Sequence, residues 1–233
     1  MEHITQNVQE IRKELDQLAQ RMGKRPDEIL LVAVTKTRTA EEINAAIDAG
    51  ITDIGENKVQ EILDKYESVK PVRWHLIGHL QSNKVKYIID KVSLIHSVDS
   101  FRLAEEIQRR ALQHGIVMDI LIQVNAAEEE SKFGIHQEET TKLIHDILAN
   151  CPNIRICGLM TIAPFEEDPE SVRKFFHQLH EIYDQCSKTL DHPNLKMQYL
   201  SMGMSHDFRV AIEEGSNLVR IGTALFGARN YTK

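Results

Sequence analysis

The chain has 233 residues, of which 42% are hydrophobic and 27% are charged, and its formal net charge is −7 at pH 7. This composition is that of an ordinary globular protein long enough to bury one sizeable core. An acidic chain lacks the basic face that nucleic acids and anionic membranes require, so we expect neither of these partners. A small anionic ligand would have to be held by a local group of residues.

The first 15 residues carry scattered charges and have no apolar core of the signal-peptide type. No segment reaches the roughly 18 consecutive apolar residues that a membrane span needs, so a cytoplasmic protein is expected. Cys151, Cys157 and Cys186 are an odd number of cysteines without zinc-type spacing, which indicates reduced thiols.

A second pattern that could bind a metal ion is the pair His75 and His79, four residues apart. The apolar residues around this pair predict a strand rather than a helix, and on a strand the two rings do not converge on one ion. We therefore predict no metal site, although His79 at the end of the strand could contact a ligand.

The first predicted element is an amphipathic helix, because apolar residues recur at spacings of three and four over residues 4–22. A buried strand follows at 29–36. Thr39 and Glu42 then form a capping box that begins a helix, and Gly50 stands where that helix ends.

The same succession of strand and helix recurs along the whole chain. The later helix over 168–186 is predicted to begin with Asp168 as N-cap and Pro169 as its first residue. The seven further units pair these segments: 52–57 with 58–67, 73–78 with 82–90, 92–98 with 100–114, 117–124 with 137–149, 154–160 with 168–186, 197–201 with 206–214, and 217–222 with 223–228.

Eight apolar strands, each followed by a helix, predict a parallel sheet that is covered on both faces and closes into a (β/α)₈ TIM barrel. We expect one domain over residues 1–233, in which the N-terminal helix precedes the barrel. A doubly wound open sheet is the alternative. Its G-x-G-x-x-G fingerprint is missing after the first strand, where VAVTKTRT stands at 32–39.

Chemistry in such barrels sits at the carboxyl ends of the strands. Lys36 ends the first strand, where partial desolvation favours a neutral amine that can attack an aldehyde. The alternative is an ordinary surface lysine. Glycine and hydroxyl residues after the seventh and eighth strands suit a phosphate, although they also form turns. Together with Arg220, they suggest an aldehyde-bearing phosphorylated cofactor; these residues are Ser201, Gly203, Gly222 and Thr223.

Six segments in this order resemble the YggS/PROSC family of pyridoxal 5′-phosphate (PLP) homeostasis proteins, whose barrels are similar to the N-terminal domain of alanine racemase. The resemblance implies that Lys36 holds PLP as a Schiff base, that Asn57 lies beside the cofactor, and that the four glycine and hydroxyl residues named above bind its phosphate. Arg220 is implied to face the pyridine nitrogen or to share in binding the phosphate. The segments are VAVTK (32–36), IGENKVQE (54–61), WHLIGHLQSNK (74–84), LMTIAP (159–164), LSMGMSHDF (200–208) and VRIGTALFG (219–227).

We therefore expect a PLP carrier that buffers the cofactor or delivers it transiently to apo-enzymes. No catalytic residue is assigned, and a monomer is expected, with a weak dimer left open. An arginine cannot hand a proton to the pyridine nitrogen, which disfavours transaminase-like chemistry. The alternative is a weak amino-acid racemase with Lys36 as one of two bases; in alanine racemases the second base comes from a further domain, which we do not expect after Lys233. Lys132 could form a secondary Schiff base.

Overall fold

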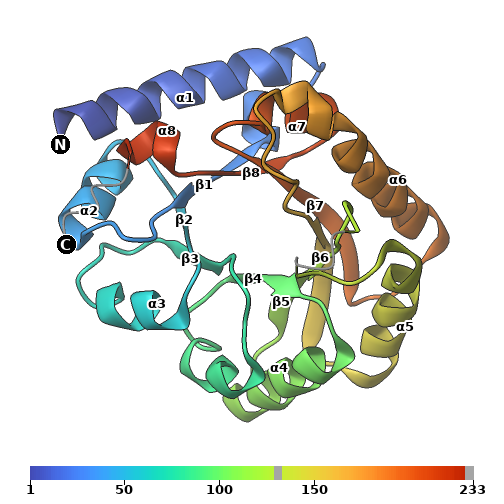
Figure 1. Ribbon diagram of the computed structural model, residues 1–233. Coiled ribbons are helices and arrows are strands. Elements are labelled where there is room, and N and C mark those ends of the chain that lie inside the picture. The colour runs from blue at the N-terminus through green and yellow to red at the C-terminus, as the bar shows by residue number, and fades with distance from the viewer. Residues whose placement is uncertain (129–132, 229–233) are drawn as a thin grey trace.

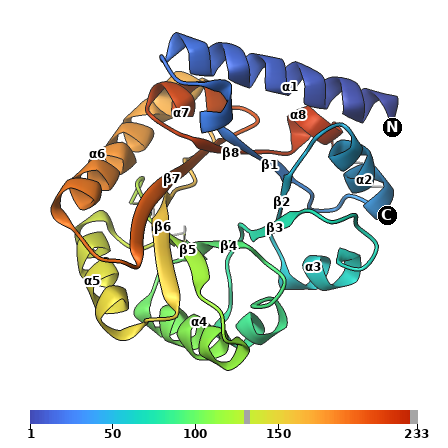
Figure 2. The same ribbon diagram turned by 180° about the vertical axis from the view of Figure 1, so that it is seen from behind.

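The structure is a computed structural model that describes residues 1–128 and 133–228, so Lys132 lies outside the described residues. Eight parallel strands form a closed barrel in which each strand neighbours the next in sequence. Leu30 of the first strand pairs with Leu218 of the last, which closes the ring. The helices lie outside the ring of strands (Figures 1 and 2). The predicted (β/α)₈ barrel with a preceding helix is confirmed.

The elements follow the predicted order. The strands are β1 (Leu30–Val34), β2 (Asp53–Glu56), β3 (Arg73–Leu76), β4 (Leu94–Val98), β5 (Met118–Gln123), β6 (Ile154–Met160), β7 (Leu195–Met204) and β8 (Leu218–Ile221). The α-helices are α1 (Glu2–Arg21), α2 (Ala40–Asp48), α3 (Val59–Lys65), α4 (Phe101–His114), α5 (Thr140–Asn150), α6 (Arg173–Thr189), α7 (Phe208–Glu213) and α8 (Thr223–Phe226).

Local capping signals place two helix starts as predicted. The Thr39 side chain accepts a hydrogen bond from the backbone of Glu42, whose carboxylate bonds back to Thr39. Asp168 caps the segment before α6, although its first turn, Pro169–Val172, is a 3₁₀ helix. The α-helix expected over 82–90 is also wrong in type: Ser82–Tyr87 is a 3₁₀ helix, because its N–H groups bond carbonyls three residues back.

Every strand has one face towards the barrel interior and one towards the helices, because side chains alternate along a strand. Val32, Leu94 and Leu218 belong to a small cluster inside the barrel. Ala33 and Ile95, each one residue along, belong to the larger core between strands and helices. All three cysteines are buried and none forms a disulfide.

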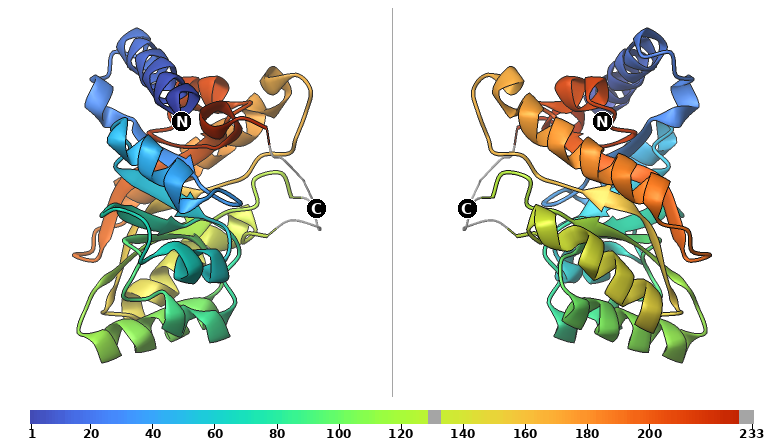
Figure 3. Two further views of the ribbon diagram at one scale, coloured as in Figure 1. Left: turned by 90° about the vertical axis from the view of Figure 1, so that its left-hand side faces the viewer. Right: turned by 90° about the vertical axis from the view of Figure 1, so that its right-hand side faces the viewer.

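The helix α1 covers the side of the barrel next to α8, which is only four residues long. Helix α1 packs against α2, α7 and α8 through an apolar stripe that includes Ile4, Val8 and Ile11. In Figure 1, α1 runs along the outer edge of the ring. Seen from the side, the segment between β6 and α6 extends beyond the strands at one end (Figure 3). Among the described residues, no helix combines the length and apolar character of a membrane span.

Gly158 of β6 provides a test of the strand packing. Its φ is +142°, and a Cβ there would lie 1.8 Å from the backbone oxygen of Tyr199 on β7. Gly158→Ala should therefore lower the free energy of unfolding by about 3 kcal/mol. The control is Gly115→Ala, where φ is +65° but no atom lies within 4 Å; this change should cost about 1 kcal/mol. Urea unfolding measures both, and equal losses would contradict the close approach of β6 and β7.

Candidate functional site

A cavity of about 340 Å³ opens at the carboxyl ends of β1 and β8. Four of the seven residues predicted from the sequence line it, and three lysine or arginine side chains give it positive charge. Within residues 1–128 and 133–228, no aspartate or glutamate lines this cavity. Its walls are formed by Val34, Lys36, Arg38, Phe165, Met204, Ser205, His206, Arg220, Gly222 and Thr223.

The segment that carries Lys36 is held in a defined backbone conformation. The N–H of Thr35 bonds the carbonyl oxygen of Gly55 at 3.0 Å, which continues the β1–β2 pairing to the residue before Lys36. Thr37, the residue after it, has a φ of +64°, a backbone conformation that residues other than glycine rarely adopt. The Glu61 carboxylate accepts the N–H of Thr37 at 2.6 Å and so fixes this turn.

A partly buried ionic cluster contacts this turn and was not predicted from the sequence. Lys65 Nζ donates to the backbone oxygen of Thr35 at 3.0 Å and to the carboxylates of Glu56 at 2.8 Å and Glu61 at 2.9 Å. The Thr35 hydroxyl donates to Glu56 at 2.7 Å. Burial raises the pKa of Glu56 even though Lys65 opposes the shift. The cluster joins the two residues that flank Lys36 to β2 and α3.

Two backbone donors converge at the start of α8. The N–H groups of Gly222 and Ala224 both point at the hydroxyl oxygen of Ser205, at 3.2 and 3.3 Å. Ser205 was not selected from the sequence, although it lies inside the LSMGMSHDF segment. The arrangement marks a point beside Thr223 where an oxygen atom accepts two backbone hydrogen bonds.

Arg38 ties the β1–α2 connection to the end of α8. Its guanidinium donates to the backbone oxygen of Gly227 at 2.5 Å and lies 5.5 Å from the centre of the Phe226 ring. It also pairs with Glu42 at 3.5 Å. Since Arg38 lines the cavity, it adds a second cation on the same side as Lys36.

Arg220 and Ser201 lie in the barrel interior. Arg220 is 3% exposed, and it donates to the Ser201 hydroxyl at 2.5 Å and to the backbone oxygen of Thr161 at 2.8 Å. Burial lowers the pKa of Arg220 to about 10, so the guanidinium stays charged at neutral pH. Ser201 is fully buried behind Arg220, and its hydroxyl does not line the cavity.

Gly203 and Asn57 also lie outside the cavity wall. A Cβ on Gly203 would approach Ala211 Cβ to 2.7 Å and Phe208 Cα to 2.9 Å, so this glycine lets α7 pack closely on β7. The half-buried Asn57 follows β2, and its backbone oxygen would lie 2.3 Å from a Cβ on Gly78. In the structure, these two positions shape the backbone around the carboxyl ends of the strands.

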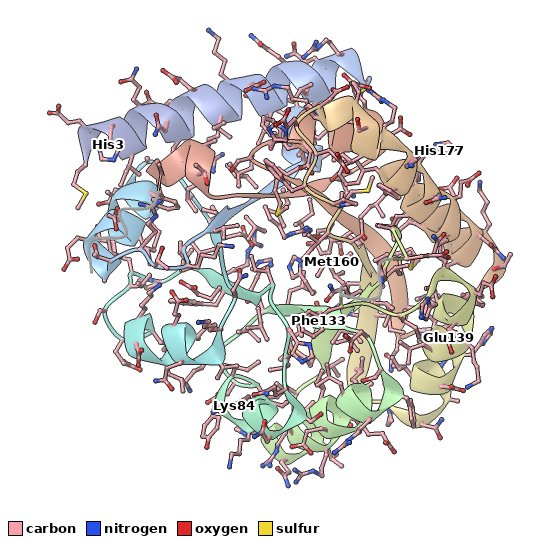
Figure 4. The ribbon with its side chains drawn as sticks, viewed as in Figure 1. His3, Lys84, Phe133, Glu139, Met160 and His177 are labelled. Atoms are coloured by element: carbon pink, nitrogen blue, oxygen red, sulfur yellow. The ribbon has the colours of Figure 1, made fainter. Side chains whose placement is uncertain are left out.

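The two histidines considered as a metal pair have separate partners. His75 is buried, and its ring nitrogens lie 2.9 Å from Asp53 Oδ1 and 2.9 Å from His96 Nε2. His79 instead stacks on Phe133, with ring centres 4.1 Å apart. Figure 4 labels Phe133 and Met160, which lie towards the middle of the ring of strands in that view.

Polar contacts continue from His75 across the barrel. His96 Nδ1 lies 3.1 Å from the Ser201 hydroxyl, and Ser201 contacts Arg220 as described above. At the other end, Arg73 forms a two-pronged ion pair with Asp53 at 2.8 and 2.7 Å. The buried residues Asp53, His75 and His96 were not predicted as part of any site.

The Asp53 carboxylate generates a testable pH dependence. Burial would raise its pKa, but hydrogen bonds from His75, Arg73 and Thr52 outweigh burial and lower the pKa to about 2, from 3.8 in an unfolded chain. Its contribution to stability is therefore complete above pH 3.8 and is lost as the pH falls towards 2. The difference in free energy of unfolding between wild type and Asp53→Asn should shrink by about 1 to 2 kcal/mol over this range. Urea unfolding between pH 6 and about pH 2 measures it, and a constant difference would contradict the assignment.

Comparison with known proteins identifies the family. Residues 6–230 match the model of the alanine racemase N-terminal domain. The pyridoxal phosphate homeostasis protein of Aquifex aeolicus (strain VF5) is 44% identical over 228 residues, which cover 97% of this chain and 98% of that protein. The protein of the same name from Escherichia coli (strain K12) is 39% identical over 243 residues and covers both chains fully.

A solved structure shows the same architecture. PipY of Synechococcus elongatus PCC7942, with PLP bound, has a TM-score of 0.78 and 32% sequence identity to this chain. The match covers 91% of this chain and 99% of PipY. The resemblance stated from six sequence segments is thereby confirmed over nearly the whole length. The chain belongs to the alanine racemase N-terminal domain family and, within it, to the pyridoxal phosphate homeostasis proteins.

Proposed function

We propose that this chain binds PLP as a Schiff base on Lys36 and serves in PLP homeostasis by holding the cofactor reversibly and delivering it to apo-enzymes. The observation that supports this function best is the cavity that brings Lys36 together with Arg38 and Arg220 and with convergent backbone donors. A site with cationic walls and an amine suits a phosphorylated aldehyde. As proposed, the chain acts as a monomer and meets its recipients transiently.

The residues present fit the cofactor's phosphate. The N–H groups of Gly222 and Ala224 already converge on the Ser205 oxygen, so a phosphate oxygen can be accepted in the same way. The Thr223 hydroxyl is placed between these donors in the sequence, and Arg38 adds positive charge on the same side of the cavity. We assign Gly222, Thr223 and Ala224 to the phosphate. Ser201, Gly203 and Asn57 do not line the cavity and are assigned to the support of its walls.

The direction of Arg220 favours a place beside the cofactor's ring. Its guanidinium bonds the Ser201 hydroxyl on β7 and the backbone oxygen of Thr161, the residue that follows β6. A guanidinium only donates hydrogen bonds, and with a pKa of about 10 it does not give up its proton at neutral pH. Bound PLP supplies an aldehyde that exchanges between amines. Arg220 therefore stabilises an acceptor at the ring without protonating it, which suits holding the cofactor.

The cavity offers few groups for proton transfer besides Lys36. Among the described residues, no tyrosine lines it, and the ring of His206 bonds the backbone oxygens of Glu166 and Glu167 at 3.0 and 3.1 Å. A racemase needs acids and bases on both faces of its substrate. The surroundings of Lys36 therefore support a carrier over the racemase alternative.

Trapping the Schiff base tests the role of Lys36. Borohydride reduction of the protein with added PLP, followed by mass mapping, should place the modification on Lys36, and Lys36→Ala should lose the visible absorption of the Schiff base. Lys58→Ala is the matched control, because Lys58 is exposed just beyond β2 and lies outside the cavity wall. Modification spread equally over surface lysines would contradict the proposal, and amino-acid racemisation that is lost in Lys36→Ala would favour the racemase.

The phosphate assignment predicts selectivity among vitamin B6 aldehydes. Pyridoxal, which lacks the phosphate, should bind about 100-fold more weakly than PLP, because charge-assisted hydrogen bonds contribute about 1.5 to 3 kcal/mol each. Thr223→Val should weaken PLP binding and leave pyridoxal binding unchanged. Titration followed by absorbance measures both affinities. Equal affinities for the two aldehydes would contradict a phosphate site at α8.

A further inference from the structure

A continuous chain of buried polar groups crosses the barrel beneath the cavity. It runs from Arg220 on β8 through Ser201 on β7, His96 on β4 and His75 on β3 to Asp53 on β2, with successive contacts of 2.5, 3.1, 2.9 and 2.9 Å. β4 and β7 are not neighbours in the closed barrel, so the contact between His96 and Ser201 spans its interior. All five side chains are at most 3% exposed.

With both histidine rings neutral, the two ends of this chain determine the direction of every hydrogen bond in it. A carboxylate such as Asp53 only accepts, and a guanidinium such as Arg220 only donates. His75 must therefore donate from Nε2 to Asp53, which leaves its Nδ1 to accept from His96 Nε2–H. His96 Nδ1 then accepts the Ser201 hydroxyl proton, and Ser201 Oγ accepts from Arg220. Both histidines are neutral in this arrangement, and each carries its proton on Nε2.

The reverse direction leaves a group unsatisfied. If His96 carried its proton on Nδ1, it would donate to Ser201, whose hydroxyl proton would lose its acceptor in the chain. An unsatisfied buried polar group costs about 1 to 3 kcal/mol. Burial lowers the pKa of His96 well below its ordinary value, and the positive charge of Arg220 acts in the same direction, which agrees with a neutral ring.

We propose that His96 and His75 are positioning residues for PLP binding: through Ser201, they hold the Arg220 guanidinium in the orientation that the cavity requires. This inference rests on the proposed function and extends it, because the orienting groups lie in the barrel interior and reach Asp53 at the first residue of β2. Ser201 then serves the site through its hydroxyl contact with Arg220 rather than through contact with a phosphate.

The barrel contains a matched comparison for the Asp53 end. Asp53 pairs in register with Arg73 on β2 and β3, and Asp119 pairs in register with Arg155 on β5 and β6. Both arginines bind their carboxylates through two bonds of 2.7 to 2.8 Å. Asp53 also bonds a histidine, His75, whereas Asp119 has no such bond among the described residues. Asp119→Asn therefore changes an ion pair of the same bond geometry, though with a more exposed carboxylate, without touching the chain to Arg220.

The proton positions are measurable in the ligand-free protein. Nitrogen-15 NMR of histidine-labelled wild type at neutral pH should show His75 and His96 protonated on Nε2 and not on Nδ1, with assignments from the variants His75→Gln and His96→Gln. A proton on Nδ1 of either ring would overturn the proposed direction. This measurement requires no cofactor and depends on no variant that has to bind PLP.

Variants of His96 test the effect on PLP binding. Gln can donate to His75 and accept from Ser201, so His96→Gln should keep the PLP affinity within about threefold, whereas His96→Leu breaks both bonds and should weaken it about tenfold or more. Ser201→Ala should resemble His96→Leu, and Asp119→Asn should match wild type. Thermal unfolding of each variant verifies that it is folded. If His96→Leu fails to fold, Ser201→Ala carries the comparison.

The outcomes separate this inference from the proposed function. If wild type binds PLP and both His96→Leu and Ser201→Ala bind it as tightly, the positioning role is wrong and the proposed function stands. If wild type does not bind PLP, the proposed function fails and the positioning role fails with it, while the NMR result still reports the direction of the chain. Weaker binding in His96→Leu with rescue in His96→Gln supports the inference.

Discussion

The alternation of inner and outer side chains in a closed eight-stranded barrel governs both the core and the site. Ile54, Trp74 and Ile95 face the helices and build the larger core. The residue next to each of them, Asp53, His75 and His96, faces inward and is polar. A buried polar group requires a partner, and these side chains satisfy one another across the interior. The same network contacts Arg220 at the cavity, so the side chains that fill the barrel interior also orient a residue of the site.

Much of the fold followed from periodicity and caps alone, because strands buried on both faces and helices with an apolar stripe carry strong local signals. The 3₁₀ conformation of Ser82–Tyr87 was not predictable in this way, since apolar residues three and four apart suit both helix types. Lys36, Arg220, Gly222 and Thr223 were selected because they stand at or near the ends of strands, and in the structure all four line one cavity.

The supporting residues were harder to find for physical reasons. Glu61 and Lys65 lie on a helix surface, where charged residues usually face water, and only the tertiary structure brings them to the residues that flank Lys36. A lone histidine such as His96 inside an apolar strand has no sequence neighbour that identifies its partner. Ser201 was assigned to phosphate as a hydroxyl residue at the end of the seventh strand and from the family resemblance, but its hydroxyl contacts Arg220 in the barrel interior. A sequence signal was nevertheless present, because Asp53, His75 and His96 all occupy inward-facing positions of their strands.

Lys36 and the donors at α8 are proposed to hold one PLP molecule between them. A crystal structure of the protein soaked with PLP tests it most directly. We predict electron density continuous with Lys36 Nζ, with the phosphate accepting the N–H groups of Gly222 and Ala224 and the Ser205 hydroxyl displaced from them. PLP bound elsewhere, or in this cavity without a bond to Lys36 and with its phosphate away from α8, would contradict the account.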